Sequence, residues 1–250
     1  MRLFTAVLAL ASSLAIAADA PDARALIADS SGKALFHQQP YRMQMHNDVQ
    51  MQSASMNQTI AMDMKISVAP GRFRMDMSPA PMVATFVSDG QFTYFYLGAM
   101  KKYMKKPAAG SPEGLAESLL PGVSSMMGQA NQLSTAKIVR DETLSVGDLK
   151  RDCFVVEYTI DKLSVTKPAA IAISNVRATV WIDKERKLSL KQTSDAEMQM
   201  GGPSTPPMKM HQETVVTLLD LAPAFAADEF TFTPPDGAEQ VDSLPGMPAS

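Results

Sequence analysis

The residues that most often carry chemistry in proteins are few in this chain, and their spacing does not suit catalysis. Its three histidines, His37, His46 and His211, form no His-x-x-x-His pair and no other spacing that would hold zinc. The chain contains no G-x-S-x-G segment for a serine nucleophile and no G-x-G-x-x-G or G-x-x-x-x-G-K loop for phosphate. Carboxylates such as Glu157 and Asp161 fit the solvent face of a strand. The sequence therefore predicts that the protein is not an enzyme and uses no cofactor.

Methionine is the abundant residue type with ligand chemistry. Among the 19 methionines, Met-x-Met pairs occur at Met43/Met45, Met62/Met64, Met75/Met77, Met198/Met200 and Met208/Met210. Thioether sulfur suits Cu(I), and His211 directly follows the last pair. A Cu(I)-binding protein that uses Met208, Met210 and His211 is therefore one alternative. Sacrificial oxidation of the methionines is another.

The same alternation is what one face of a β-strand produces, because successive strand side chains point to opposite faces. By this rule the segments 41–51, 56–68 and 72–77 are three strands, each with an apolar face and a polar face. The apolar face that we expect to line a cavity carries Met43, Met45, Met62, Met64, Phe73, Met75 and Met77. Unbranched thioether side chains would let this face adapt to ligands of varied shape.

Other short strands surround these three, which indicates a mainly β domain with a few helices. We predict a helix over 22–36, with Asp22 as its N-cap, and a loop over 162–175. Strands are predicted at 83–87, 92–97, 100–105, 136–144, 153–160, 176–182, 188–200, 208–219 and 229–233. Cys153, the one cysteine, lies in an apolar strand and is expected to be a buried, inert thiol.

The segment 107–133 interrupts the β pattern with two short helical stretches separated by Pro121-Gly122. Helices inserted in a sheet protein must cover a face or an opening of the sheet. Their apolar positions include Leu115, Leu119, Met126 and Met127. The segment is either a crossover packed on the core or a movable lid hinged at Pro121-Gly122.

The N-terminus has the pattern of a secretory signal peptide: Arg2, an apolar run, and Ala15-Ile16-Ala17 as a cleavage signal. We expect cleavage after Ala17, export to the periplasm of a Gram-negative cell, one domain over 18–241 and a flexible tail over 242–250. The net charge is -3 and no basic stripe occurs, so a nucleic-acid partner is not expected.

In the C-terminal half, Trp181-Ile182-Asp183 is followed by Leu188, and residues 230–241 read FTFTPPDGAEQV. The first segment is similar to the W-x-D turn and return strand of the LolA-like proteins, and the second resembles their closing F-x-F-x-P-P-x-G-A-x-x-V segment. The order of elements is also similar over nearly the whole mature chain. The Met-rich composition departs from the family pattern.

This resemblance implies a half-open, strongly curved antiparallel β-barrel, with helices covering an apolar concave face. It also implies a non-enzymatic carrier or binding protein for a lipid, an acyl chain or a lipoprotein, with a donor or acceptor protein in the membrane. A protein-binding sensor of the RseB type is the alternative within the same fold. We expect a monomer.

Overall fold

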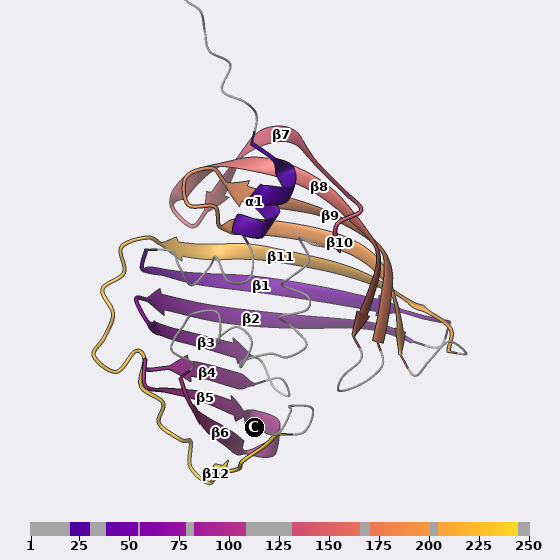
Figure 1. Ribbon diagram of the computed structural model, residues 1–250. Helices are drawn as coiled ribbons and strands as arrows, with labels where there is room; N and C mark the ends of the chain where they lie inside the picture. The colour runs from indigo at the N-terminus through magenta and orange to yellow at the C-terminus, as the bar shows by residue number, and fades with distance from the viewer. Residues whose placement is uncertain are drawn as a thin grey trace, which may run out of the picture.

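The computed structural model describes residues 21–30, 39–54, 56–78, 83–108, 132–165, 171–200 and 205–244. Its strands form a single twelve-stranded sheet in the order β12-β6-β5-β4-β3-β2-β1-β11-β10-β9-β8-β7 (Figure 1). The edge strands β12 and β7 do not pair with each other, so the sheet is strongly curved but open. The predicted signal peptide and most of the predicted helical insert lie outside the described residues.

The strands agree closely with the alternation of the sequence in the first half of the sheet. They are β1 (Tyr41–Gln52), β2 (Asn57–Ala69), β3 (Arg72–Ser78), β4 (Ala84–Ser88), β5 (Phe92–Leu97), β6 (Lys102–Pro107), β7 (Thr135–Val146), β8 (Leu149–Val165), β9 (Ile171–Asp183), β10 (Ser189–Met200), β11 (Met208–Asp220) and β12 (Glu239–Gln240). A 3-10 helix, η2 (Gly98–Met100), precedes β6. Strands β8 and β9 extend into the predicted loop over 162–175, which is therefore shorter than expected.

One short α-helix, α1 (Ala23–Asp29), is present among the described residues and lies over β8 to β10 (Figure 1). Asp22 caps its N-terminus by accepting a hydrogen bond from the Arg24 N–H at 3.1 Å. Leu26 and Ile27 are buried in a cluster with Tyr158 and Ile160 of β8. We call the face of the sheet that carries α1 the inner face, and the opposite one the outer face.

Helix α1 covers the first part of the helix predicted over 22–36, and residues 31–36 of that prediction lie outside the described residues. The helix ends at Asp29, and the N–H of Ser30 donates to the carbonyl of Leu26 as a C-cap. The Ser30 hydroxyl also donates to the carbonyl of Ile27 at 3.2 Å. Serine competes in this way with the regular helix ladder, which favours the end of α1 at this position. Coverage of the inner face by several helices is thus not seen among the described residues.

The strand predicted at 229–233 is wrong, because residues 229 and 230 lie in a turn and residues 231–233 have no regular secondary structure. This segment lies on the outer face of the first six strands, where Phe232 stacks on Tyr94 with ring centroids 5.0 Å apart. Phe230 is buried beneath Arg72, whose guanidinium is 4.8 Å from the ring centroid. The alternating Phe-Thr-Phe-Thr sequence therefore anchors an irregular strap rather than a strand. After it, β12 pairs in parallel with β6. Leu244, which belongs to the tail predicted over 242–250, is buried in the core, and residues 245–250 lie outside the described residues.

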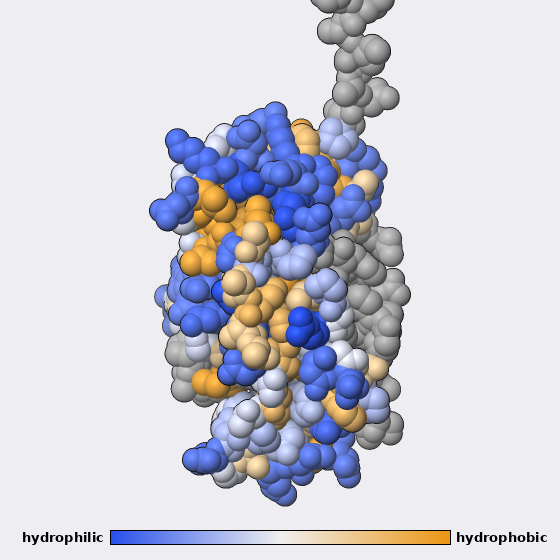
Figure 2. Space-filling view, turned by 90° about the vertical axis from the view of Figure 1, so that its left-hand side faces the viewer, coloured by the Kyte–Doolittle hydropathy of each residue, from blue (hydrophilic) through white to orange (hydrophobic). Residues whose placement is uncertain are grey.

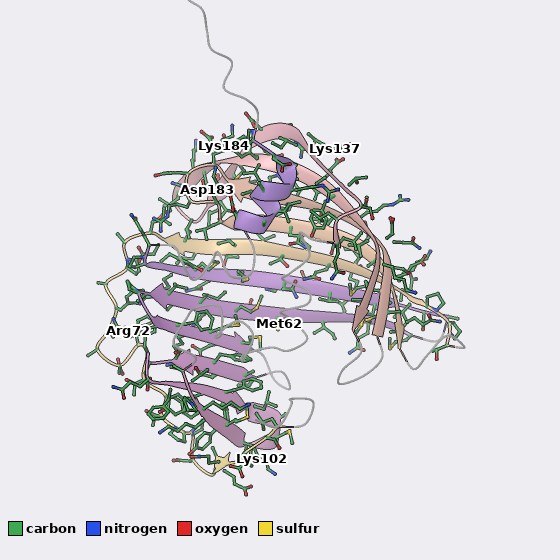
Figure 3. All side chains as sticks on the ribbon, viewed as in Figure 1. Met62, Arg72, Lys102, Lys137, Asp183 and Lys184 are labelled. Carbon is green, nitrogen blue, oxygen red and sulfur yellow. The ribbon has the colours of Figure 1, made fainter. Side chains whose placement is uncertain are left out.

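The W-x-D segment is the end of β9 and leads into the turn before β10. Asp183 is 1% exposed, and its carboxylate accepts a hydrogen bond from the backbone N–H of Arg186 at 3.1 Å. It also pairs with Arg151 of β8 at 2.7 Å. Hydrogen bonding and the charge of Asp183 raise the pKa of the Arg151 guanidinium, with a smaller contribution from Glu185. Asp183 thus ties the turn to the neighbouring strand, near the upper left of Figure 3.

Candidate ligand-binding face

The inner face is uncharged across its central strands. The register pairs Met43 with Ile66 and Met45 with Met64, and paired residues share a face. Following the pairs outward gives an inner-face set of Met45, Asn47, Val49, Met51, Ile60, Met62, Met64, Ile66, Met75, Met77, Val156, Tyr158, Ala178, Val180, Gln192, Ser194, Ala196, Met198, Met208, Met210, Gln212 and Thr214. Charged residues of the same strands, such as Lys65 and Asp195, alternate onto the outer face.

Burial along the inner face falls from one end of the strands to the other. In β2 the last four residues, Ile66 to Ala69, are buried, whereas the first three are exposed. One end therefore forms a closed core around Tyr41, Phe73 and Phe86. At the other end, which we call the open end, apolar inner-face residues such as Met51 and Met62 are only half-buried.

The closed end has a shallow apolar groove of its own on the surface. Leu149, Leu218 and Leu221 line this groove, and the first two are exposed. Figure 2 views the molecule from this end and shows apolar residues gathered on its surface. The groove lies at the opposite end of the strands from the open part of the inner face, so it is a separate feature.

The predicted cavity residues share the inner face but divide along the burial gradient. Met43 and Phe73 are each 2% exposed and belong to the closed core. Met45, Met75 and Met77 are partly buried and pack against that core. Met62 and Met64 are half-buried farther along β2, and Figure 3 places Met62 over the middle of the sheet. The lid residues Leu115, Leu119, Met126 and Met127 lie outside the described residues.

A row of methionines crosses the open end. Met51 of β1 pairs with Met210 of β11, and Met198 of β10 pairs with Met208 of β11. Directly opposed residues of antiparallel strands have Cβ atoms about 5 Å apart. The non-local pairing of β1 with β11 thus brings together methionines that are far apart in the sequence.

His211 does not join this row. It lies on the outer face, where its Nδ1 atom is 2.8 Å from Asp195 Oδ1. Met208, Met210 and His211 therefore do not converge on one point, as a shared Cu(I) site would require. Within the part of the chain that the structure describes, no group of three or more His, Cys, Asp or Glu residues could hold a metal ion.

Cys153 is fully buried, as the sequence predicts. Its thiol donates to the carbonyl oxygen of Arg151, with the two atoms 3.6 Å apart. Burial raises the pKa of this thiol to about 12, since the thiolate would lose its hydration. The group therefore stays protonated and unreactive at neutral pH.

A polar band, which the sequence pattern did not predict, crosses the inner face at its centre. Its members are Asn47 of β1, Gln212 and Thr214 of β11, and Gln192 and Ser194 of β10. The Thr214 hydroxyl donates to Asn47 Oδ1 at 2.7 Å, and Gln212 Nε2 donates to the same oxygen at 2.9 Å. The available signal was Asn47 itself, a polar residue within the alternating apolar positions of β1.

The polar band continues onto β8. Gln192 Nε2 donates to the hydroxyl of Tyr158 at 3.3 Å. Burial raises the pKa of Tyr158 to about 12, so this hydroxyl is neutral. The polar band therefore consists entirely of uncharged hydrogen-bonding groups.

A family model described as "Predicted periplasmic protein (DUF2092)" matches residues 29–244. The chain belongs to this family of predicted periplasmic proteins. The match ends at Leu244, the residue that the structure buries after β12. A comparison with the curated proteins finds no match. Among the described residues, no helix has the length and apolar composition needed to cross a membrane.

Several solved structures are similar to the chain at low identity. An uncharacterized conserved protein from Thermus thermophilus is 10% identical, with 82% of this chain and 90% of that chain covered and a TM-score of 0.37. A putative outer membrane lipoprotein-sorting protein domain from Vibrio parahaemolyticus is 14% identical, with coverages of 84% and 94% and a TM-score of 0.28. A DUF1329 family protein from Desulfovibrio piger is 10% identical, with coverages of 83% and 95% and a TM-score of 0.31.

Proposed function

We propose that the protein is a non-enzymatic periplasmic carrier that binds an acyl-chain ligand, either a lipid or a lipoprotein, on the open end of its inner face. The observation that carries this proposal is the uncharged, Met-rich inner face, whose burial decreases toward Met62, Met64 and the methionine row. Apolar surface of this kind suits flexible hydrocarbon chains, because methionine side chains adapt to irregular shapes.

The family of predicted periplasmic proteins supports the proposed compartment. The protein would reach this compartment by export, with cleavage of the predicted signal peptide after Ala17. A carrier in that compartment would shield the acyl chain from water between two membranes. It would receive the ligand from, or deliver it to, a membrane protein. No chemical step is required, which fits the absence of catalytic motifs from the sequence.

The first test is native mass spectrometry of the protein purified from periplasm, followed by organic extraction of bound material. We expect a co-purifying phospholipid or acylated peptide. A polypeptide that carries no lipid and takes none up from added phospholipid vesicles would contradict the proposal.

A matched pair of variants places the ligand on one face. Met64 lies on the inner face of β2, and its neighbour Lys65 is exposed on the outer face. We expect Met64→Asp to abolish lipid loading while the protein still folds, because a carboxylate would have to be desolvated against an acyl chain. Lys65→Asp should leave loading unchanged. Equal loading of both variants would contradict the assignment to the inner face.

A further inference from the structure

Several hydrogen-bonding groups of the polar band have no partner among the described residues. Asn47 is 3% exposed, and its side-chain oxygen accepts both the Thr214 and the Gln212 hydrogen bonds. Its Nδ2 amide has no partner among the described residues. The Ser194 hydroxyl, on a residue that is 7% exposed, has none either. Neither atom is among the fully enclosed side-chain atoms that lack a partner, so both donors remain accessible on an otherwise apolar face. A ligand group that accepts from such a donor is favoured over one that cannot.

The polar band also offers acceptors. Gln212 and Gln192 use their Nε2 atoms as donors, to Asn47 and to Tyr158 respectively. Their Oε1 atoms have no partner among the described residues. The polar band therefore presents neutral donors and neutral acceptors side by side on adjacent strands β1, β11 and β10.

Because the polar band is uncharged, only some chemical groups of a ligand can bind there. A saturated chain would leave the Asn47 amide unpaired, and a phosphate or carboxylate would need a cation that the inner-face positions of β1, β2 and β9 to β11 do not supply. A neutral carbonyl, in contrast, accepts hydrogen bonds from an amide N–H or a hydroxyl. It also lies naturally at the head of an acyl chain.

We propose that the polar band binds the ester or amide carbonyl of an acyl group. The chain then extends toward the methionine row, and the charged headgroup remains outside the sheet. This inference rests on the proposed carrier function and specifies its ligand. Asn47 Nδ2 is the principal donor to the carbonyl oxygen, and the Ser194 hydroxyl is the second. An amide ligand would in addition donate its N–H to Gln212 or Gln192.

The test compares two lipids that differ only in the carbonyl: 1-monooleoylglycerol, an ester, and 1-O-oleylglycerol, its ether. Affinities are measured by competition against a fluorescent acyl-chain probe. The wild-type protein should bind the ester about fivefold more tightly, which corresponds to one net hydrogen bond. Asn47→Leu should remove this preference and leave the affinity for the ether unchanged or higher. Thr217→Val, on the same strand as Thr214 but at an exposed position, is the matched control and should keep the preference.

The possible outcomes separate this inference from the proposed function. Binding of neither lipid by the wild-type protein would overturn the carrier function. Equal binding of ester and ether would overturn the carbonyl assignment alone. If Asn47→Leu fails to fold, Ser194→Ala carries the test, since it deletes one hydroxyl and should reduce the ester preference by about twofold to threefold. An unchanged preference in a folded Ser194→Ala would count against the polar band.

A third lipid, N-oleoylethanolamine, distinguishes the two sources of the carbonyl. Tighter binding of this amide than of the ester, lost in Gln192→Leu, would assign the N-acyl amide of a lipoprotein. Tighter binding of the ester would assign an acylglycerol. Both results support the polar band as the carbonyl site.

Discussion

Glu229 of the C-terminal strap accepts a hydrogen bond from the hydroxyl of Ser67, with the two oxygen atoms 2.6 Å apart. Ser67 is buried on the outer face of β2, and 162 residues separate the two in the sequence. The same carboxylate pairs with Arg42 of β1 at 3.2 Å. One side chain thus attaches the closing segment of the chain to the first two strands of the sheet.

Removing this carboxylate should loosen the strap. Glu229→Ala leaves the buried Ser67 hydroxyl and the half-buried Arg42 without their acceptor, so we expect a loss of about 1–3 kcal/mol in the free energy of unfolding. Urea denaturation followed by circular dichroism measures the change. Asp228→Ala, at the exposed neighbouring position, is the control and should change the midpoint little. Identical midpoints for the two variants would show that the strap does not depend on Glu229.

Asp183 should be the costliest single carboxylate to remove. Its ion pair with Arg151 is largely buried, since the two side chains are 1% and 13% exposed. Asp183→Ala would leave the arginine without its buried partner and the β9–β10 turn without its acceptor, at a cost of about 3–5 kcal/mol. Glu185 pairs with the same arginine but is 73% exposed, so Glu185→Ala should cost less than about 1 kcal/mol. Chemical denaturation of the two variants would reveal this difference, and similar losses would contradict the assigned roles.

Two hydroxyl groups in the core offer a route to higher stability. Ser88 of β4 and Thr93 of β5 are directly paired, and both hydroxyls are fully enclosed without a hydrogen-bond partner. Thr93→Val keeps the shape of the side chain and removes an unsatisfied polar group, so we expect the free energy of unfolding to rise by about 1–2 kcal/mol. Thr59→Val, at an exposed position of β2, should have no comparable effect. A decrease in stability for Thr93→Val would mean that its hydroxyl is hydrogen-bonded in solution.

The alternation of apolar and polar residues was sufficient to predict β1 to β5 and their two faces, because strand periodicity is a local property of the sequence. The pairing of β1 with β11 is not local, and it creates both the methionine row and the polar band. Asn47 alone gave no reason to expect Gln212 and Thr214 beside it. In the closing segment, Phe230 and Phe232 have the spacing of a strand face. Their packing on Arg72 and Tyr94 overrides this local pattern.

The Cu(I) hypothesis was likewise based on the local sequence alone. Met208, Met210 and His211 are adjacent in the sequence, and this proximity suggested a shared site. Strand geometry sends neighbouring side chains to opposite faces, so the histidine lies beside Asp195 on the outer face instead. The methionines that do lie near Met208 and Met210 come from β10 and β1.

His46 should make the stability of the outer face depend on pH. Its Nδ1 atom is 2.7 Å from Asp63 Oδ1, and its Nε2 atom is 3.3 Å from Asp48 Oδ1. The hydrogen bond to Asp63 raises the pKa of His46 above its ordinary value, with Asp48 contributing and burial opposing. A raised pKa in the folded state means that the unfolded chain releases this proton first as the pH rises. The stabilisation is therefore complete below the ordinary histidine pKa of about 6.5 and is lost as the pH passes through the folded value.

An NMR titration of the His46 ring should show a pKa above about 6.5 that falls in Asp63→Asn. His46→Gln should remove the corresponding decrease in stability between about pH 6 and pH 8. A titration unaffected by Asp63→Asn would show that this pair does not form in solution.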